Sequence, residues 1–158
     1  MNDPRRYAAG ILNVALGGNM SSRLFQEIRE KRGLSYYVGS SHYSSPDDGL
    51  LLIRAGLEKQ RFDWGKQAIY ELLEDIKNKG ISEEEYQKSL GYITGKTKMG
   101  IETSDQLADF VGEQYLLKGK IETLQEILEN YKKVKQQDIQ KVAEQMLEKN
   151  NLYAYWIS

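Results

Sequence analysis

The helical spacing of this sequence is interrupted after Gly33 by a strand pattern, and this interruption sets the class of fold. Residues 34–44 are rich in aromatic and β-prone side chains, and residues 50–57 form a second apolar run. A turn signal, Pro-Asp-Asp-Gly at residues 46–49, separates the two runs. We therefore predict an antiparallel hairpin inside an otherwise mostly helical chain.

Helical periodicity covers most of the remaining sequence. Two pairs have the spacing of capping boxes and predict helix starts: Ser82 with Glu85, and Thr103 with Gln106. Three glycines stand where a helix is expected to end: Gly33, Gly80 and Gly119. The predicted helices cover residues 4–16, 22–32, 63–79, 82–100, 103–117, 121–132 and 136–148.

A last strand is predicted at residues 151–157, which gives an α+β fold with an antiparallel sheet and helices packed on one face. No repeat or linker divides the sequence, so we expect a single domain over residues 1–158. Three strands make a thin sheet whose edge must be covered or paired. Either the strands pair with another chain, which would favour a homo-oligomer, or part of a larger domain lies on the N-terminal side.

Composition excludes several kinds of chemistry. The 22 basic and 23 acidic residues give a net charge of −1, which argues against a nucleic-acid binder. The absence of cysteine excludes disulfides, cysteine–zinc sites and thiol catalysis. His42 is the single histidine, so this chain cannot build a zinc site from two or three histidines. We interpret His42 as a strand-surface or packing residue.

The first residues have the outline of a signal peptide, because two arginines precede the short apolar run at residues 7–16. Asn13 interrupts that run, which is also too short to cross a bilayer. Asp3 and Pro4 instead have the pattern of a helix start. We therefore expect a cytoplasmic protein that does not associate with a membrane.

A glycine-rich segment, Gly17-Gly18-Asn19, precedes the second predicted helix, for which Ser21 is the expected cap. The free N–H groups of such a helix start could hold a phosphate or another anion. We favour a tight turn that needs a positive φ angle, with Asn19 in the left-handed region. Neither the lysine spacing of a phosphate-binding loop nor a preceding strand is present.

Arg29 and Tyr36 are the two candidate site residues. Arg29 lies in the last turn of the second predicted helix, and Tyr36 lies early in the first strand, with Gly33 between them. A guanidinium and a phenol are both hydrogen-bond donors, so together they could hold a peptide carbonyl or a developing oxyanion. Spacing alone favours a structural role, because an arginine near a helix C-terminus also interacts with the helix dipole.

Residues 16–38 resemble the C-terminal half-domain of the pitrilysin/insulinase-like zinc metallopeptidases, a group that includes the mitochondrial processing peptidase and its bacterial relatives. The shared pattern is Leu-Gly-Gly-Gly-Met-Ser-Ser-Arg-Leu-Phe, followed by Ile-Arg-Glu-Lys-(Arg)-Gly-Leu-x-Tyr. The order of the downstream elements is also similar, so the resemblance covers essentially the whole chain. Asn19 replaces the third glycine of the pattern.

The resemblance implies a peptidase of four similar half-domains, in one long chain or two shorter ones. The first half-domain would hold zinc through a His-x-x-Glu-His motif and a distant glutamate. The last would bind the peptide substrate with an arginine and a tyrosine, which correspond to Arg29 and Tyr36. The resemblance also implies strands ahead of the first helix, which would explain the thin sheet.

This chain has no His-x-x-Glu-His motif, so we expect that it holds no zinc and is inactive alone. Its first expected function is the substrate-binding half of a zinc metalloendopeptidase, with zinc in an N-terminal partner half-domain of the same chain or of a separate subunit. The alternative is a non-catalytic structural or interaction subunit with the same fold.

Overall fold

The computed structural model describes residues 3–45 and 48–157. Its elements follow the predicted order: the described residues form seven helical regions and one hairpin, and short helical turns join some of them. The bounds are α1 Arg5–Asn13, η1 Val14–Gly18, η2 Phe25–Lys31, β1 Ser35–Ser44, β2 Gly49–Leu57, η3 Lys59–Arg61, α2 Phe62–Lys79, α3 Glu83–Met99, α4 Ser104–Lys118, α5 Leu124–Lys133, α6 Gln136–Met146 and η4 Lys149–Asn151.

The predicted helix ends are confirmed at the residues that cap them. Ser82 with Glu85, and Thr103 with Gln106, each form both hydrogen bonds of a capping box. Such a box satisfies backbone N–H groups that a helix start would otherwise leave unpaired. The described residues with positive φ are the three glycines expected to end helices, at 33, 80 and 119. Only glycine adopts this backbone region without steric cost.

The hairpin is antiparallel, as predicted, and its two strands form the sheet of the described residues. Pro46 and Asp47 of the predicted turn lie outside the described residues, and the Ser45 N–H donates to the Asp48 carbonyl at 2.8 Å beside them. The pairing is regular from Val38 to Ser44 and shifts by one residue between Ser35 and Val38.

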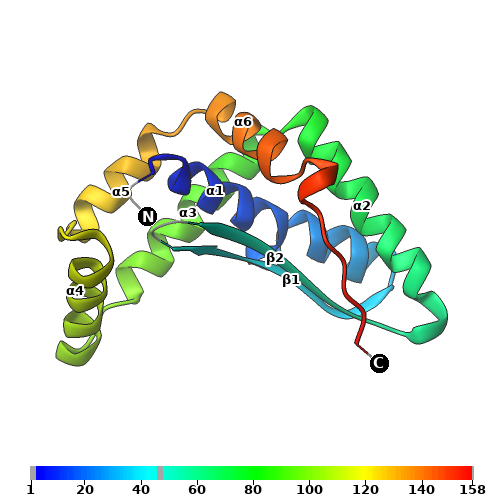
Figure 1. The fold of residues 1–158 in the computed structure, drawn as a ribbon, viewed down its shortest axis with the longest axis horizontal. Helices are drawn as coiled ribbons and strands as arrows, with labels where there is room; N and C mark the ends of the chain where they lie inside the picture. Colours follow the sequence, from blue (N-terminus) through cyan, green and yellow to red (C-terminus); the bar gives the residue numbers. More distant parts are fainter. Residues whose placement is uncertain (1–2, 46–47, 158) are drawn as a thin grey trace.

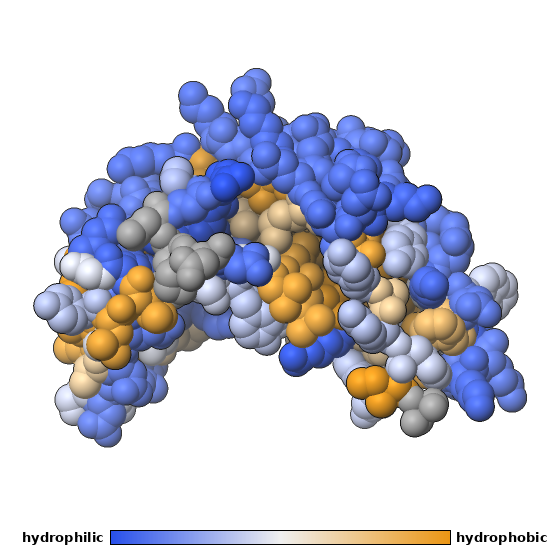
Figure 2. All heavy atoms as spheres, viewed as in Figure 1, coloured by the Kyte–Doolittle hydropathy of each residue, from blue (hydrophilic) through white to orange (hydrophobic). Residues whose placement is uncertain are grey.

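The helices cover one face of the hairpin, which confirms the predicted α+β arrangement. In Figure 1, α1, α2 and α6 lie on one side of the two strands, and the other side stays open. The fully buried apolar side chains come from α1, η1, the η2 region, α2 and α6, and the partly buried side chains of Val38, Leu51, Ile53 and Leu57 pack against them from the strands. Together these elements form an arch, and Figure 2 shows that the molecule is hollowed beneath it, with apolar surface inside the hollow.

The predicted strand at residues 151–157 is wrong for the described residues. Residues 149–151 form a turn of 3₁₀ helix, and residues 152–157 have no regular secondary structure. Trp156 packs on Phe62 with ring centroids 4.2 Å apart, whereas Tyr155 is 89% exposed. A β-prone segment becomes a strand only when another strand pairs with its backbone, and neither β1 nor β2 does so here.

None of the helices in the described part of the chain combines the length and the apolar character that crossing a membrane requires.

Candidate functional site

The junction between η2 and β1 carries both candidate residues. Gly33, with φ of +56°, turns the chain from the helix into the strand. The Gly33 N–H donates to the Arg29 carbonyl at 3.1 Å, and the Leu34 N–H donates to the Ile28 carbonyl at 2.9 Å. Leu34 and Ile28 are both buried. The helix end and the start of the strand therefore form one hydrogen-bonded unit anchored in the core.

Arg29 lies in the last turn of its helix, as predicted. The last turns are π-helical, and the Arg29 guanidinium lies over the Phe25 ring, 4.7 Å from its centroid. Its Nε is 3.9 Å from the Glu30 carboxylate, and the side chain is 43% exposed. A cation–π contact of this kind limits the positions of the guanidinium while its N–H groups stay open to a ligand.

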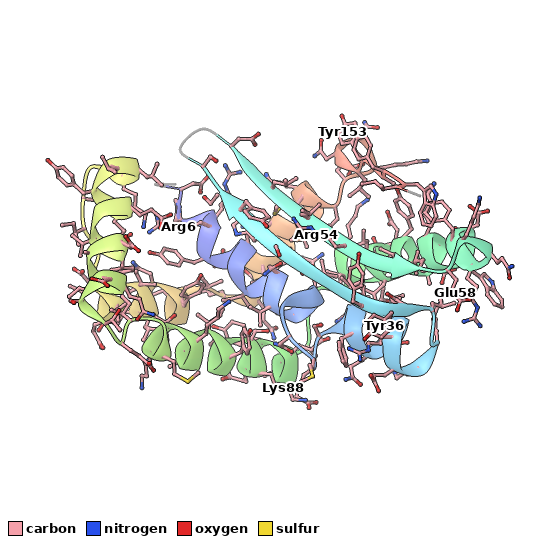
Figure 3. The ribbon with its side chains drawn as sticks, turned by 90° about the horizontal axis from the view of Figure 1, so that it is seen from below. Arg6, Tyr36, Arg54, Glu58, Lys88 and Tyr153 are labelled. Carbon is pink, nitrogen blue, oxygen red and sulfur yellow. The ribbon has the colours of Figure 1, made fainter. Side chains whose placement is uncertain are left out.

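Tyr36 is 86% exposed at the second residue of β1. Figure 3, which views the open side of the hairpin, shows Tyr36 at the end of β1 beside the η2 helix. Among the described residues, no hydrogen bond or ring contact engages the Tyr36 side chain. Its hydroxyl is thus a free donor and acceptor at the surface.

The structure therefore exposes both predicted residues at one helix–strand junction, and neither is buried in the apolar core. No hydrogen bond joins Arg29 to Tyr36 in the part of the chain that is described. Each side chain keeps donors for a group outside the chain. A carbonyl or a developing oxyanion is the chemical group that two such donors suit best.

Arg23 is part of the glycine-rich sequence pattern, and in the structure it holds the η2 region in place, a role that the pattern did not predict. Its guanidinium donates to both carboxylate oxygens of Glu85, at 2.5 and 2.8 Å, to Asp75 at 3.0 Å and to the Gly80 carbonyl at 3.0 Å. These partners lie more than 50 residues further along the chain. Spacing in the sequence therefore contains no signal for this contact.

Burial raises the pKa of Glu85, but the hydrogen bonds and charge of Arg23, together with the Ser82 N–H, outweigh it, so that the pKa is lowered. Glu85 is thus an ionised partner of Arg23 at neutral pH. Glu85 is one of three glutamates in the first turn of α3, where negative charge is favourable beside the helix N-terminus.

The described residues of this chain do not fit a catalytic zinc ion. Among residues 3–45 and 48–157, no group of three or more histidine, cysteine or acidic side chains is arranged to hold a metal. His42 lies on β1, where burial lowers its pKa, and it shares a pocket with Arg6 of α1 and Met146 of α6. This position agrees with the packing role expected for His42.

The glycine-rich segment differs from the prediction. Gly17 and Gly18 have ordinary negative φ angles, and Asn19 is extended at φ −156°. Gly17 is required for close packing instead, because a Cβ there would lie 2.5 Å from the backbone nitrogen of Ser40 on β1. No side-chain hydrogen bond caps η2, so the cap expected at Ser21 is not formed; instead the Asn19 Oδ1 accepts the Ser21 N–H at 2.7 Å, as in an Asx turn.

The structure also argues against anion binding by this segment, because two of its backbone N–H groups are already hydrogen-bonded. The Ser21 N–H is bonded to the Asn19 side chain, and the Ser22 N–H donates to the Asn19 carbonyl at 3.2 Å. Because both groups are already paired, they do not form an open anion cradle.

Together, the fold and the site define an α+β domain that exposes an arginine and a tyrosine and has no metal site in its described residues. Residues 1–90 match the model of a family described as the peptidase M16 inactive domain. This chain belongs to that family, which confirms the resemblance to pitrilysin-type peptidases.

Relatives and solved structures agree with this assignment. An uncharacterized zinc protease of Streptomyces coelicolor is 35% identical over 92% of this chain, and one of Bacillus subtilis is 35% identical over 90%. This chain spans 32% and 35% of their respective lengths, about a third. The names of these relatives connect the family with zinc.

The fold is shared with a peptidase M16 inactive domain from Pseudomonas fluorescens, at a TM-score of 0.81 and 18% identity, over 91% of this chain and 34% of that one. A conserved protein from Enterococcus faecalis gives a TM-score of 0.80 at 23% identity, over 90% of this chain and 33% of that one.

Proposed function

We propose that this chain is the substrate-holding half of a zinc-dependent metalloendopeptidase. The observation that carries the proposal is the exposure of Arg29 and Tyr36, with free donors, at one rigid helix–strand junction. In this proposal the zinc ion belongs to an N-terminal half-domain, in the same polypeptide or in a separate subunit. The metal chemistry would be supplied there, because the described residues of this chain do not fit the ion.

Arg29 and Tyr36 would act on the peptide backbone. The guanidinium would donate to a substrate carbonyl, and the phenol would donate to the oxygen on which negative charge develops. A donor already fixed at that point stabilises the transition state without reorganisation, and losing one typically costs about 10²–10³-fold in rate. The Phe25 ring under Arg29 and the core anchors beside Gly33 supply the required rigidity.

The test is the activity of Tyr36→Phe and Arg29→Lys in the assembled peptidase, this chain together with its zinc-binding half. The probe is an internally quenched fluorescent peptide, selected from a random library because the wild type cleaves it. We expect kcat/KM to fall about 100-fold for Tyr36→Phe, since only the donated hydrogen bond is removed. Tyr153→Phe is the matched control, an exposed tyrosine in the C-terminal segment (Figure 3). Wild-type turnover in both site variants would refute the proposal.

The alternative is an interaction subunit without catalysis. It is supported by the open face of the hairpin and by the unpaired C-terminal segment, where Tyr153, Tyr155 and Ile157 are exposed. Exposed strand edges and apolar side chains favour association. Light scattering of the chain alone measures this: a homo-oligomer combined with full activity of both site variants would favour the interaction subunit.

A further inference from the structure

Beside the candidate site, a short segment of β1 contains one more residue than the segment of β2 that pairs with it. Ser35 is opposite Leu57, and Val38 is opposite Ala55, so three steps along β1 face two steps along β2. This is the arrangement of a β-bulge, in which two residues of one strand face a single residue of the other. Tyr36 and Tyr37 are the two residues inside the bulge.

The bulge decides which face of the sheet presents Tyr36. In a regular strand alternate residues share a face, so Tyr36 would share the face of Val38 and Ser40. Val38 packs against the apolar core, and the Ser40 hydroxyl donates to the Asn13 carbonyl at the end of α1. A phenol on that face would be directed into the helices. The observed 86% exposure of Tyr36 shows that the extra residue changes its direction.

Ser35 closes the bulge with its side chain. Its hydroxyl contacts the carbonyl oxygen of Tyr37, within the bulge, and the carbonyl oxygen of Gly56, across the sheet at 3.0 Å. A bulge leaves backbone groups without their ladder partners, and a buried carbonyl without a donor is unfavourable. Ser35 is itself buried, so its hydroxyl is a fixed donor located between the two strands.

The neighbouring tyrosine occupies the space on the other strand. A Cβ at Gly56 would lie 2.5 Å from the Tyr37 ring, which shows that this ring lies directly against the Gly56 backbone. Tyr37 therefore packs on the sheet, while Tyr36 projects from it. The two adjacent tyrosines have different environments because of the bulge that Ser35 closes.

We propose that Ser35 is a positioning residue for peptide hydrolysis: its hydroxyl fixes the bulge, and the bulge directs the Tyr36 phenol toward the bound peptide. This inference rests on the proposed function of Tyr36 and adds the residue through which the fold controls its direction. Ser35 does not touch the substrate, so its effect passes entirely through Tyr36.

The test compares Ser35→Thr with Ser35→Val in the assembled peptidase, using the quenched peptide described above. Threonine and valine have nearly the same shape and both suit a strand, so the two variants differ in the hydroxyl. We expect Ser35→Val to lower kcat about tenfold or more with KM within about twofold, because misplacing a group that acts in the transition state costs rate rather than binding. We expect Ser35→Thr to retain at least about half of the wild-type kcat.

Ser40→Val is the matched control. Ser40 is on the same strand and also donates to a backbone carbonyl, but outside the bulge. We expect this variant to lower the melting temperature and to leave kcat within about twofold of the wild type. If Ser40→Val lowers kcat as much as Ser35→Val does, the loss comes from general destabilisation and the inference is overturned.

A double-mutant cycle with Tyr36→Phe separates this inference from the proposed function. If Ser35 acts through Tyr36, Ser35→Val causes no further loss of kcat once the phenol is absent. If Tyr36→Phe is slow but the two losses multiply, Tyr36 retains its role and Ser35 does not position it. If Tyr36→Phe has wild-type activity, the role of the Tyr36 phenol in the proposed function fails, and the positioning role of Ser35 fails with it.

Discussion

The Arg23 contact gives a quantitative prediction about what holds the site's helix against α2 and α3. The side chains of Arg23 and Glu85 are 20% and 25% exposed, so their two-bonded pair is only partly screened by water. We assign about 2 kcal/mol to this pair, in the range for charge-assisted hydrogen bonds in proteins. The contacts with Asp75, which is 42% exposed, and with the Gly80 carbonyl add about 0.5 kcal/mol each.

Arg23→Met keeps much of the aliphatic bulk and removes all four hydrogen bonds. We therefore expect a loss of about 3 kcal/mol in the free energy of unfolding, and a fall of roughly 6–12 °C in melting temperature for a chain of this size. Urea unfolding followed by far-UV circular dichroism measures the first quantity. Arg32→Met is the matched control, because its pair with Glu71 is longer, at 3.4 Å, and both side chains are about half exposed. We expect Arg32→Met to lower the free energy of unfolding by no more than about 0.5 kcal/mol.

The same pair predicts a dependence on pH. The folded-state pKa of Glu85 is lowered, so the pair contributes stability above the unfolded-state pKa of about 4.3 and loses it as the pH falls through the folded-state value. The difference in unfolding free energy between the wild type and Arg23→Met should therefore become smaller at acidic pH. A loss below about 1 kcal/mol at pH 7, or one equal to that of Arg32→Met, would refute this account of the contact.

Two further predictions concern the hairpin and its packing. Gly17→Ala should cost about 1–3 kcal/mol of unfolding free energy, because its Cβ would collide with the Ser40 backbone. Gly91→Ala, in a part of α3 where a Cβ meets nothing within 4 Å, should instead stabilise by about 0.5–1 kcal/mol; equal effects in urea titrations would contradict this reasoning. Burial lowers the pKa of His42, so the unfolded chain takes up its proton first as the pH falls below about 6.5, and stability declines. We expect the melting temperature of His42→Gln to fall less than that of the wild type between pH 7 and pH 5. An equal fall in both proteins would contradict this role of His42.

Local sequence signals predicted the helices and their ends well. A capping box at Ser82 or Thr103 involves residues only three apart, and a glycine such as Gly33 ends a helix through its own backbone freedom. The Arg29 and Tyr36 positions were also found from the sequence, through the motif around them. Whether they bind substrate stays a prediction.

Predictions that depended on distant neighbours were less successful. The segment at residues 151–157 has strand-like composition, but a strand also needs a paired backbone. Gly17 was assigned to a turn, although its absent side chain makes room for Ser40 on a strand more than 20 residues away. The doublet Tyr36-Tyr37 interrupts strict alternation and was the one available signal for the bulge.

The sequence by itself determined the order of helices and hairpin, the helix ends and the two candidate donors, because each depends on side chains within one or two turns of one another. Tertiary structure decided how η2 is fixed by Arg23, how closely Gly17 approaches β1, and that a bulge closed by Ser35 turns Tyr36 outward. These features depend on contacts between residues far apart in the chain, whose geometry exists only after the core has packed.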